Sequence, residues 1–119
     1  MRYLLLICGN EQEEARMSER QAADQHQKWD AYAGELGQTG KLLGGERLRP
    51  ASSATTVRLQ NGKQLLSDGP YAETKEQLGG YFLIEATDLD EAVGWASKMP
   101  HLPLGGVVEV RPIWDMGTD

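Results

Sequence analysis

The sequence predicts an α+β fold in which strands and helices follow one another in a βαββαβ order with an added β-hairpin. Residues 4–7 and 81–84 are continuously apolar, as in strands that are buried on both faces. Ser18 and Asp88 each stand at the start of an amphipathic helical pattern, where their side chains can cap a helix. Asn61-Gly62 is the strongest short signal for a tight hairpin turn.

The first half of the chain predicts one strand and one long helix. The strand covers residues 2–8, and a polar loop over residues 9–16 follows it. Ser18 and Gln21 form a capping box that opens the helix, which ends between Gly37 and Gly40. One apolar stripe of this helix is expected to face the sheet: Ala22, His26, Trp29, Ala33 and Leu36.

The second half predicts a hairpin, a long loop and a strand–helix–strand unit. Residues 46–49 form a weak strand, and residues 55–60 and 63–67 form the two strands of the hairpin. Residues 67–80 read as a long loop, in which residues 73–78 are compatible with one helical turn. A strand at 81–84 leads into the helix capped by Asp88, and an edge strand at 107–113 completes the sheet.

Two helices can cover only one face of the resulting antiparallel sheet. The continuous apolar runs predict that the other face is also covered. A second copy of the chain would cover it, and pairing of the two sheets would close a barrel in a homodimer. The alternative is a monomer in which the long loop covers the sheet.

Composition bounds the classes of function. The 119 residues form one domain, 1–119, with 12 Lys and Arg against 18 Asp and Glu. The basic residues are scattered, which counts against binding to a nucleic acid. The longest apolar run, residues 3–8, is too short for a membrane span or a secretory signal. Cys8 is the single cysteine, and this fits a cytoplasmic protein with an inert, packed thiol.

A long segment of the chain resembles a known family. The stretch DGPYAETKEQLGGYFLIEATDLDEAVGWASKMP at residues 68–100, followed by VVEVRPI at 107–113, closely resembles YCII-related proteins of the DGPF subfamily. The likeness extends more loosely over residues 2–113, with KLLGGERLRP at 41–50, and departs at Tyr71, where the subfamily name implies Phe. The resemblance implies a ferredoxin-like fold that assembles as a dimeric α+β barrel.

The resemblance also implies a range of activities. Related YCII proteins include a dehydrochlorinase that acts on a chlorinated hydroxyquinol, and a His and an Asp of the family cleft have been proposed as acid/base groups. The helix His of that proposal falls on His26, whereas the Asp has no clear match and His101 stands near its expected place. Other members are encoded beside extracytoplasmic-function sigma factors, which implies a link to sigma-factor-dependent transcription.

The candidate catalytic residues are His26 and Asp68. An imidazole that points from a helix into a cleft can take a proton near neutral pH, although a core His bonded to a backbone carbonyl is the plainer interpretation. Asp68-Gly69-Pro70 is equally well suited to building a turn. The candidate ligand-binding residues are Tyr71, Glu73, Lys75, Glu76, His101 and Arg111. No metal site is expected, because Cys8, His26 and His101 have no recognised ligand spacing.

Two classes of function follow. The first is a cofactor-free lyase or isomerase with His26 as acid or base, Arg111 or Lys75 orienting a small anionic ligand, and residues 68–80 closing the cleft. The second is a non-catalytic ligand-binding or interaction module that acts with a sigma factor.

Overall fold

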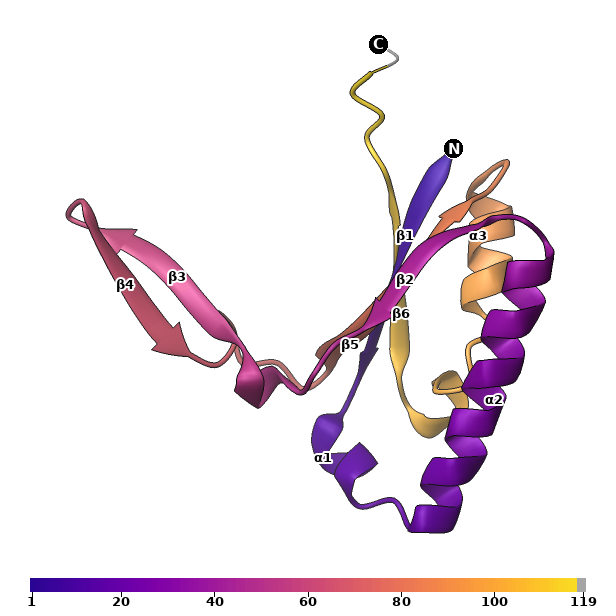
Figure 1. Ribbon diagram of the computed structural model, residues 1–119, viewed down its shortest axis with the longest axis horizontal. Helices are drawn as coiled ribbons and strands as arrows, with labels where there is room; N and C mark the ends of the chain where they lie inside the picture. Colours follow the sequence, from indigo (N-terminus) through magenta and orange to yellow (C-terminus); the bar gives the residue numbers. More distant parts are fainter. Residues whose placement is uncertain (118–119) are drawn as a thin grey trace.

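The computed structural model describes residues 1–117 and has the predicted mixed α+β architecture (Figure 1). The elements follow in the order β1 (Arg2–Gly9), α1 (Glu11–Ala15), α2 (Glu19–Gln38), β2 (Leu42–Arg47), β3 (Thr55–Gln60), β4 (Lys63–Asp68), β5 (Gln77–Glu85), α3 (Leu89–Ala96) and β6 (Val107–Pro112).

Four of the strands form one antiparallel sheet in the order β2-β5-β1-β6, with β1 hydrogen-bonded to both β5 and β6. Figure 1 shows α2 and α3 on the same side of this sheet. Without the hairpin, the remaining strands and the two helices follow the βαββαβ order. The predicted ferredoxin-like fold with two helices on one face is therefore confirmed.

Strands β3 and β4 form a separate two-stranded sheet that extends away from the body of the molecule (Figure 1). Its turn is the predicted one, because Asn61 and Gly62 have φ angles of 52° and 75°. We call residues 55–68 the arm. The arm contributes to a radius of gyration of 16.5 Å, compared with about 13.5 Å for a compact domain of this length.

The helix starts are also as predicted. Ser18 Oγ accepts a hydrogen bond from the Gln21 amide at 3.1 Å, and the Gln21 side chain accepts one from the Ser18 amide at 2.9 Å. Asp88 caps α3 by accepting from the Glu91 amide at 2.9 Å. These contacts satisfy amide groups that a helix cannot pair within itself.

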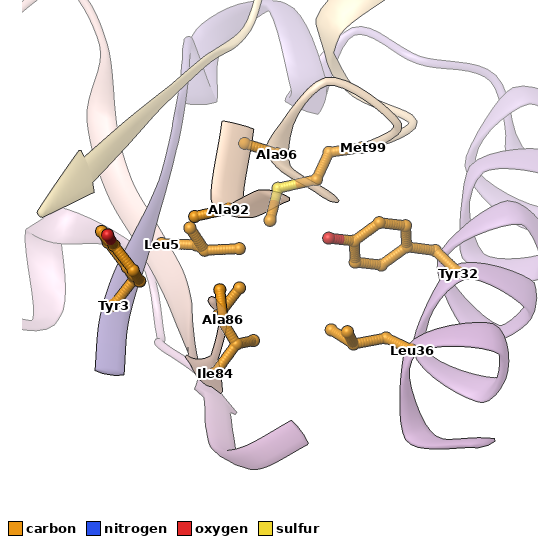
Figure 2. Packing of buried hydrophobic residues seen from close by; sticks show 9 residues of the cluster. All are labelled: Tyr3, Leu5, Tyr32, Leu36, Ile84, Ala86, Ala92, Ala96 and Met99. Carbon is orange, nitrogen blue, oxygen red and sulfur yellow. The ribbon is translucent and has the colours of Figure 1, made fainter. Parts of the chain in front are cut away.

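The hydrophobic core lies between the sheet and the two long helices (Figure 2). Its buried members come from β1, β5, α2, α3 and the segments that follow β5 and α3: Tyr3, Leu5, Tyr32, Leu36, Ile84, Ala86, Ala92, Ala96 and Met99. The hydroxyl of Tyr32 donates to the Trp95 carbonyl at 2.9 Å, so this polar group is paired inside the core. Burial, with a smaller contribution from Glu35, raises the pKa of Tyr32 well above its ordinary range.

The predicted stripe of α2 is wrong over the first turns of the helix. Ala22 and His26 are exposed, and the side that faces the body of the protein carries Gln25, Trp29, Tyr32 and Leu36. Gln25 reaches inwards because its amide donates to the Pro100 carbonyl at 3.4 Å. A polar side chain with a backbone partner thus takes the place that the sequence pattern assigns to an apolar one.

Three further boundaries differ from the sequence prediction. Residues 11–15 form the short helix α1, capped by Asn10, instead of remaining in a loop. Strand β2 begins at Leu42, earlier than expected, because its backbone pairs with β5. Strand β5 begins at Gln77, so the long loop is shorter, and residues 73–78 contain no helical turn.

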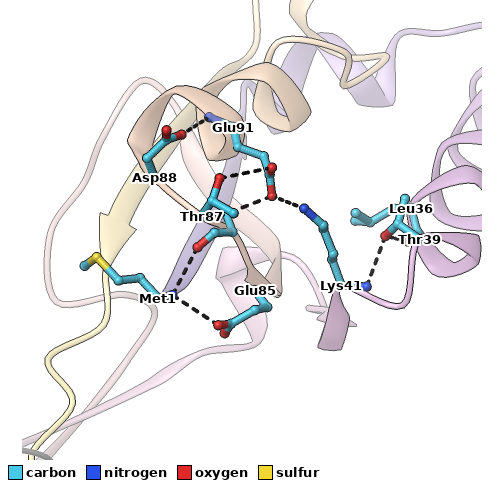
Figure 3. Close-up of polar contacts among 9 residues, drawn as sticks. Met1, Leu36, Thr39, Lys41, Glu85, Thr87, Asp88 and Glu91 are labelled. Atoms are coloured by element: carbon cyan, nitrogen blue, oxygen red, sulfur yellow. Dashed lines mark hydrogen bonds and ion pairs between the residues drawn. The ribbon is translucent and has the colours of Figure 1, made fainter.

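Polar contacts connect the segment after α2 with the start of α3 (Figure 3). Thr39 Oγ1 donates to the Leu36 carbonyl at 2.6 Å and accepts from the Lys41 amide at 3.0 Å. The Lys41 ammonium group forms an ion pair with Glu91, which also accepts hydrogen bonds from Thr87. The hydrogen bond from Lys41 holds the pKa of the Glu91 carboxyl below its ordinary value.

Candidate functional site

His26 lies on the outer surface of α2 rather than against the sheet. Its Nε2 atom is 3.4 Å from Oδ2 of Asp30, one helical turn further on. The two side chains are 71% and 73% exposed. The expectation that this imidazole points toward the sheet is therefore wrong, because Gln25 and Trp29 occupy the inward-facing positions of these turns.

The pairing of His26 with Asp30 creates a familiar chemical arrangement. A carboxylate beside one imidazole nitrogen orients the ring, while the other nitrogen stays available to a ligand. Sequence reasoning missed Asp30, although a spacing of four residues on a predicted helix brings two side chains together. That spacing was the signal that could have found the pair.

His101 occupies a very different environment. It is 92% buried, since its relative exposure is 8%. Its Nε2 atom lies 2.9 Å from the Val107 carbonyl and must therefore carry the hydrogen. Nδ1 is buried without a hydrogen-bond partner among residues 1–117. The ring stacks on Trp29 at a centroid distance of 5.4 Å, so His101 packs behind α2 while His26 faces outwards.

The Asp-Gly-Pro-Tyr motif builds the base of the arm. Asp68 ends β4, and the next amide, that of Gly69, donates to the Ala54 carbonyl at 2.7 Å. The Gly69 carbonyl accepts from Thr56 Oγ1 at 2.8 Å. The side chains of Asp68 and Tyr71 are exposed. These contacts give the motif a structural role in closing the hairpin.

The rest of the loop is anchored through Gln77. The Gln77 side chain donates to the Thr74 carbonyl at 2.7 Å and accepts from the Glu11 amide at 2.9 Å. Glu73 and Lys75 are exposed, and no ion pair within residues 1–117 includes Lys75. Lys75 is thus an exposed cation of this loop.

Arg111 lies on the face of the sheet that α2 and α3 leave uncovered. We call this surface the open face, and the strand registers place on it Leu4, Leu6, Cys8, Tyr81, Leu83, Glu109 and Arg111. Arg111 pairs with Glu109 at 3.2 Å. Burial, followed by the charges of Glu109 and Glu76, raises the pKa of the Cys8 thiol. Glu76 thus lies near the Cys8 end of β1, whereas Arg111 pairs with Leu4 further along the strand.

One chain does not bring all the candidate residues together. His26 is in the helix layer, Arg111 is on the open face, and Asp68 and Tyr71 are at the base of the arm. The hollows of the described surface are shallow. One of about 510 Å³ runs along the outer side of α2, and one of about 300 Å³ lies between α2 and the segment after α3. Neither is lined by His26.

Residues 1–117 contain no group of three or more His, Cys, Asp or Glu side chains that could hold a metal ion. Within the same range, no helix is both long and apolar enough to cross a membrane.

The sequence and the fold of this chain are similar to those of known proteins. A model of the YCII-related domain matches residues 1–117. The chain belongs to the YCII-related family. The sequence-based resemblance to this family is therefore confirmed.

This YCII-related chain is similar to one curated sequence, "Uncharacterized protein R00369" of Rhizobium meliloti (strain 1021). The two are 44% identical over 77 residues, which is 64% of this chain and 62% of the relative. The match thus spans less than two thirds of the length of that relative.

A solved structure is also similar to this YCII-related protein. It is 5-chloro-2-hydroxyhydroquinone dehydrochlorinase (TftG) from Burkholderia phenoliruptrix AC1100, in complex with 2,5-dihydroxybenzoquinone. The TM-score is 0.56 with 17% sequence identity, over 96% of this chain and 94% of the other. At this level of identity the likeness shows the fold.

Proposed function

We propose that this YCII-related protein, which we assign to the DGPF subfamily from residues 68–71, is a cofactor-free enzyme of the lyase or isomerase type. It moves a proton on a small polar molecule. The observation that carries the proposal is the pair formed by His26 and Asp30, whose nitrogen and oxygen atoms are 3.4 Å apart. His26 is the catalytic residue, and Asp30 is a positioning residue.

The chemistry follows from this pair. The neutral imidazole of His26 takes a proton from an acidic C–H or O–H group of the ligand, and the imidazolium that forms is stabilised by the Asp30 carboxylate. The same proton then returns to another atom of the ligand or to its leaving group, which restores the neutral imidazole. General acid–base catalysis of this kind contributes about 10²–10⁴-fold to a rate.

The fold of TftG supports the ligand class. That neighbour is named as a dehydrochlorinase of a hydroxylated ring and is seen with a dihydroxyquinone. Its ligand is small and carries acidic hydroxyl groups, so we propose a small anionic ligand for this chain as well. The sequence-based role of Arg111 or Lys75 in orienting that anion is not carried over, because Arg111 lies on the open face of the sheet and His26 on the outer surface of α2.

The proposed enzyme is a homodimer in the cytoplasm. Leu4, Leu6 and Leu83 lie on the open face, which no helix of residues 1–117 covers. A second copy that pairs with this face would bury the three side chains and close a dimeric α+β barrel. It would also add the Arg111 of each copy to the barrel interior. The unpaired thiol of Cys8 supports a reducing compartment.

The test is an NMR pH titration of His26 with 2,5-dihydroxybenzoquinone as the probe. We expect the probe to shift the midpoint of the His26 titration and to broaden its signals. Asp30→Asn should reduce probe binding, since the imidazole loses the carboxylate that orients it. The same helix offers a matched control, because Lys28 and Asp24 form a pair of the same spacing at 3.1 Å. Asp24→Asn should leave the His26 titration and the probe response unchanged.

The outcomes separate the two classes of function. Turnover of a hydroxylated ring compound that is lost in His26→Gln, with the fold and assembly intact, supports the enzyme. Probe binding that persists in His26→Gln, followed by backbone amide signals and without turnover of any compound, contradicts the enzyme. That result favours the non-catalytic binding module with its predicted sigma-factor link.

A further inference from the structure

The arm ends in an exposed asparagine–glycine turn. Asn61 and Gly62 connect β3 to β4, and Gln60 pairs with Lys63 on either side of them. Figure 1 shows this turn at the end of the arm that points away from the body. Both turn residues are exposed, and neither the Asn61 carboxamide nor the Gly62 amide has a hydrogen-bond partner within residues 1–117. A free carboxamide therefore stands next to a free backbone N–H.

These two groups can react with each other. The backbone nitrogen of Gly62 attacks the side-chain carbonyl carbon of Asn61, which forms a new C–N bond and breaks the C–N bond of the carboxamide. The displaced nitrogen takes up the Gly62 amide proton and leaves as ammonia. Water then opens the resulting cyclic imide. Opening at the side-chain carbonyl gives aspartate in the ordinary backbone, and opening at the main-chain carbonyl gives isoaspartate, in which the backbone runs through the former side chain.

The surroundings of the turn favour this reaction. Gly62 has no Cβ atom, so nothing on that residue hinders the approach of its nitrogen to the carboxamide. Ring closure requires the turn to leave its resting conformation. The turn belongs to a two-stranded hairpin, which is only marginally stable in water. Val57 and Leu59 are 61% and 78% exposed, so the described chain gives the arm little packing that would resist opening of its tip.

Asn10, the other asparagine of the chain, is the natural comparison. Its Oδ1 atom accepts a hydrogen bond from the Glu13 amide at 3.1 Å, since Asn10 caps α1. The nitrogen that would attack it belongs to Glu11, and this amide donates to Gln77 Oε1 at 2.9 Å. Both reacting groups are thus bound at Asn10, whereas both are free at Asn61.

We infer that Asn61 is a site of spontaneous deamidation, and that its conversion to isoaspartate opens the arm. Isoaspartate adds a methylene group to the main chain between the two strands. The two-residue turn then no longer fits the pairing of Gln60 with Lys63. Aspartate at the same position keeps the turn, because Asp-Gly suits it as well as Asn-Gly does. The site is separate from the pair formed by His26 and Asp30 and goes beyond the proposed enzyme.

The experiment incubates the intact full chain at mildly alkaline pH and follows both asparagines by mass spectrometry after trypsin digestion. Trypsin cuts after Lys and Arg, so Asn61 lies in the peptide of residues 59–63 and Asn10 in that of residues 3–16. We expect Asn61 to be converted while Asn10 remains an amide. In heavy-oxygen water the converted peptide should carry a solvent oxygen. Fragment ions should place the change at Asn61 rather than at Gln60, and a sample digested without incubation corrects for conversion during digestion.

Two variants serve as controls for the effect on the arm. Asn61→Gly removes the carboxamide and keeps a turn sequence of the same kind. Its arm should be unchanged after incubation, as judged by the NMR contacts between the backbones of Gln60 and Lys63. Asn61→Asp should show the same contacts before incubation. The isoaspartate form of the wild-type protein should lose them.

The urea-unfolded chain supplies the reference rate, because hydrogen bonds protect neither asparagine there. If native Asn61 stays an amide over the time in which the unfolded chain converts it, the folded turn protects it and the inference is overturned. Conversion of native Asn10 as fast as Asn61 would show that the contrast in hydrogen bonding does not select the site. An isoaspartate form that keeps the contacts of Gln60 with Lys63 would overturn the opening of the arm. None of these readouts depends on the activity assigned to His26.

Discussion

Replacing His101 tests whether this buried imidazole is a packing element or a site residue. Its Nε2 atom donates to the Val107 carbonyl at 2.9 Å, and its Nδ1 atom is buried without a partner in the described chain. Losing the hydrogen bond costs about 1 kcal/mol, and removing an unpaired buried nitrogen regains about 1 kcal/mol. The two polar effects therefore nearly cancel in any apolar replacement.

What remains is the volume of the ring, which packs on Trp29. His101→Phe keeps a ring in this space, so we expect the free energy of unfolding to change by less than about 1 kcal/mol. His101→Ala leaves a cavity, and we expect a loss of about 3 kcal/mol. Urea unfolding with an unchanged slope measures both values.

Two results would refute this reasoning. If His101→Phe is as destabilising as His101→Ala, the Nδ1 atom has a partner in solution that the packing argument omits. If His101→Phe is stable but no longer binds 2,5-dihydroxybenzoquinone, while His26 still titrates as in the wild type, then His101 contacts the ligand. That outcome would restore its sequence-based assignment as a ligand-binding residue.

Three other predictions concern the sheet, an ion pair and the thiol. A Cβ atom at Gly80 would lie 2.8 Å from a backbone carbonyl oxygen of β2, so Gly80→Ala should lower the urea midpoint of unfolding. A Cβ atom at Gly44 would have no atom within 4 Å, so Gly44→Ala should lower that midpoint much less. Because Lys41 lowers the pKa of Glu91, their pairing stabilises the fold above pH 4.5 and is lost as the pH falls through the lowered pKa. The stability difference between wild type and Lys41→Met should therefore shrink in acid, and a constant difference would contradict the assignment. Burial and nearby carboxylates raise the pKa of Cys8, so its alkylation by iodoacetamide should still accelerate above pH 9.0, and a plateau near neutral pH would show a different environment.

Sequence reasoning succeeded where local chemistry decides the structure. Ser18 and Asp88 cap helices because their side chains accept from amides three residues ahead, and the Asn61-Gly62 turn needs only positive φ angles. The α+β class followed from the alternation of strands and helices along the chain. These features depend on residues that are close together in the chain.

Sequence reasoning failed where groups that are far apart in the chain decide the structure. Gln25 faces inwards because the Pro100 carbonyl is there to accept its hydrogen bond, and this rotates His26 out to solvent. Helix α1 has five residues and no buried one, so no apolar periodicity marks it. The pattern of β3 indicates a covered face, whereas Val57 and Leu59 are exposed in the described chain.

The sheet order also determines when the strands can pair during folding. The central strand β1 pairs with β5 and β6, and β2 pairs with β5, so every pairing in the four-stranded sheet needs residues from 77 onwards. During synthesis the apolar segment of β1 therefore remains unpaired until most of the chain has left the ribosome. The arm closes through neighbouring residues and can form much earlier. The interval between these two events is when the nascent chain has the greatest need of a chaperone.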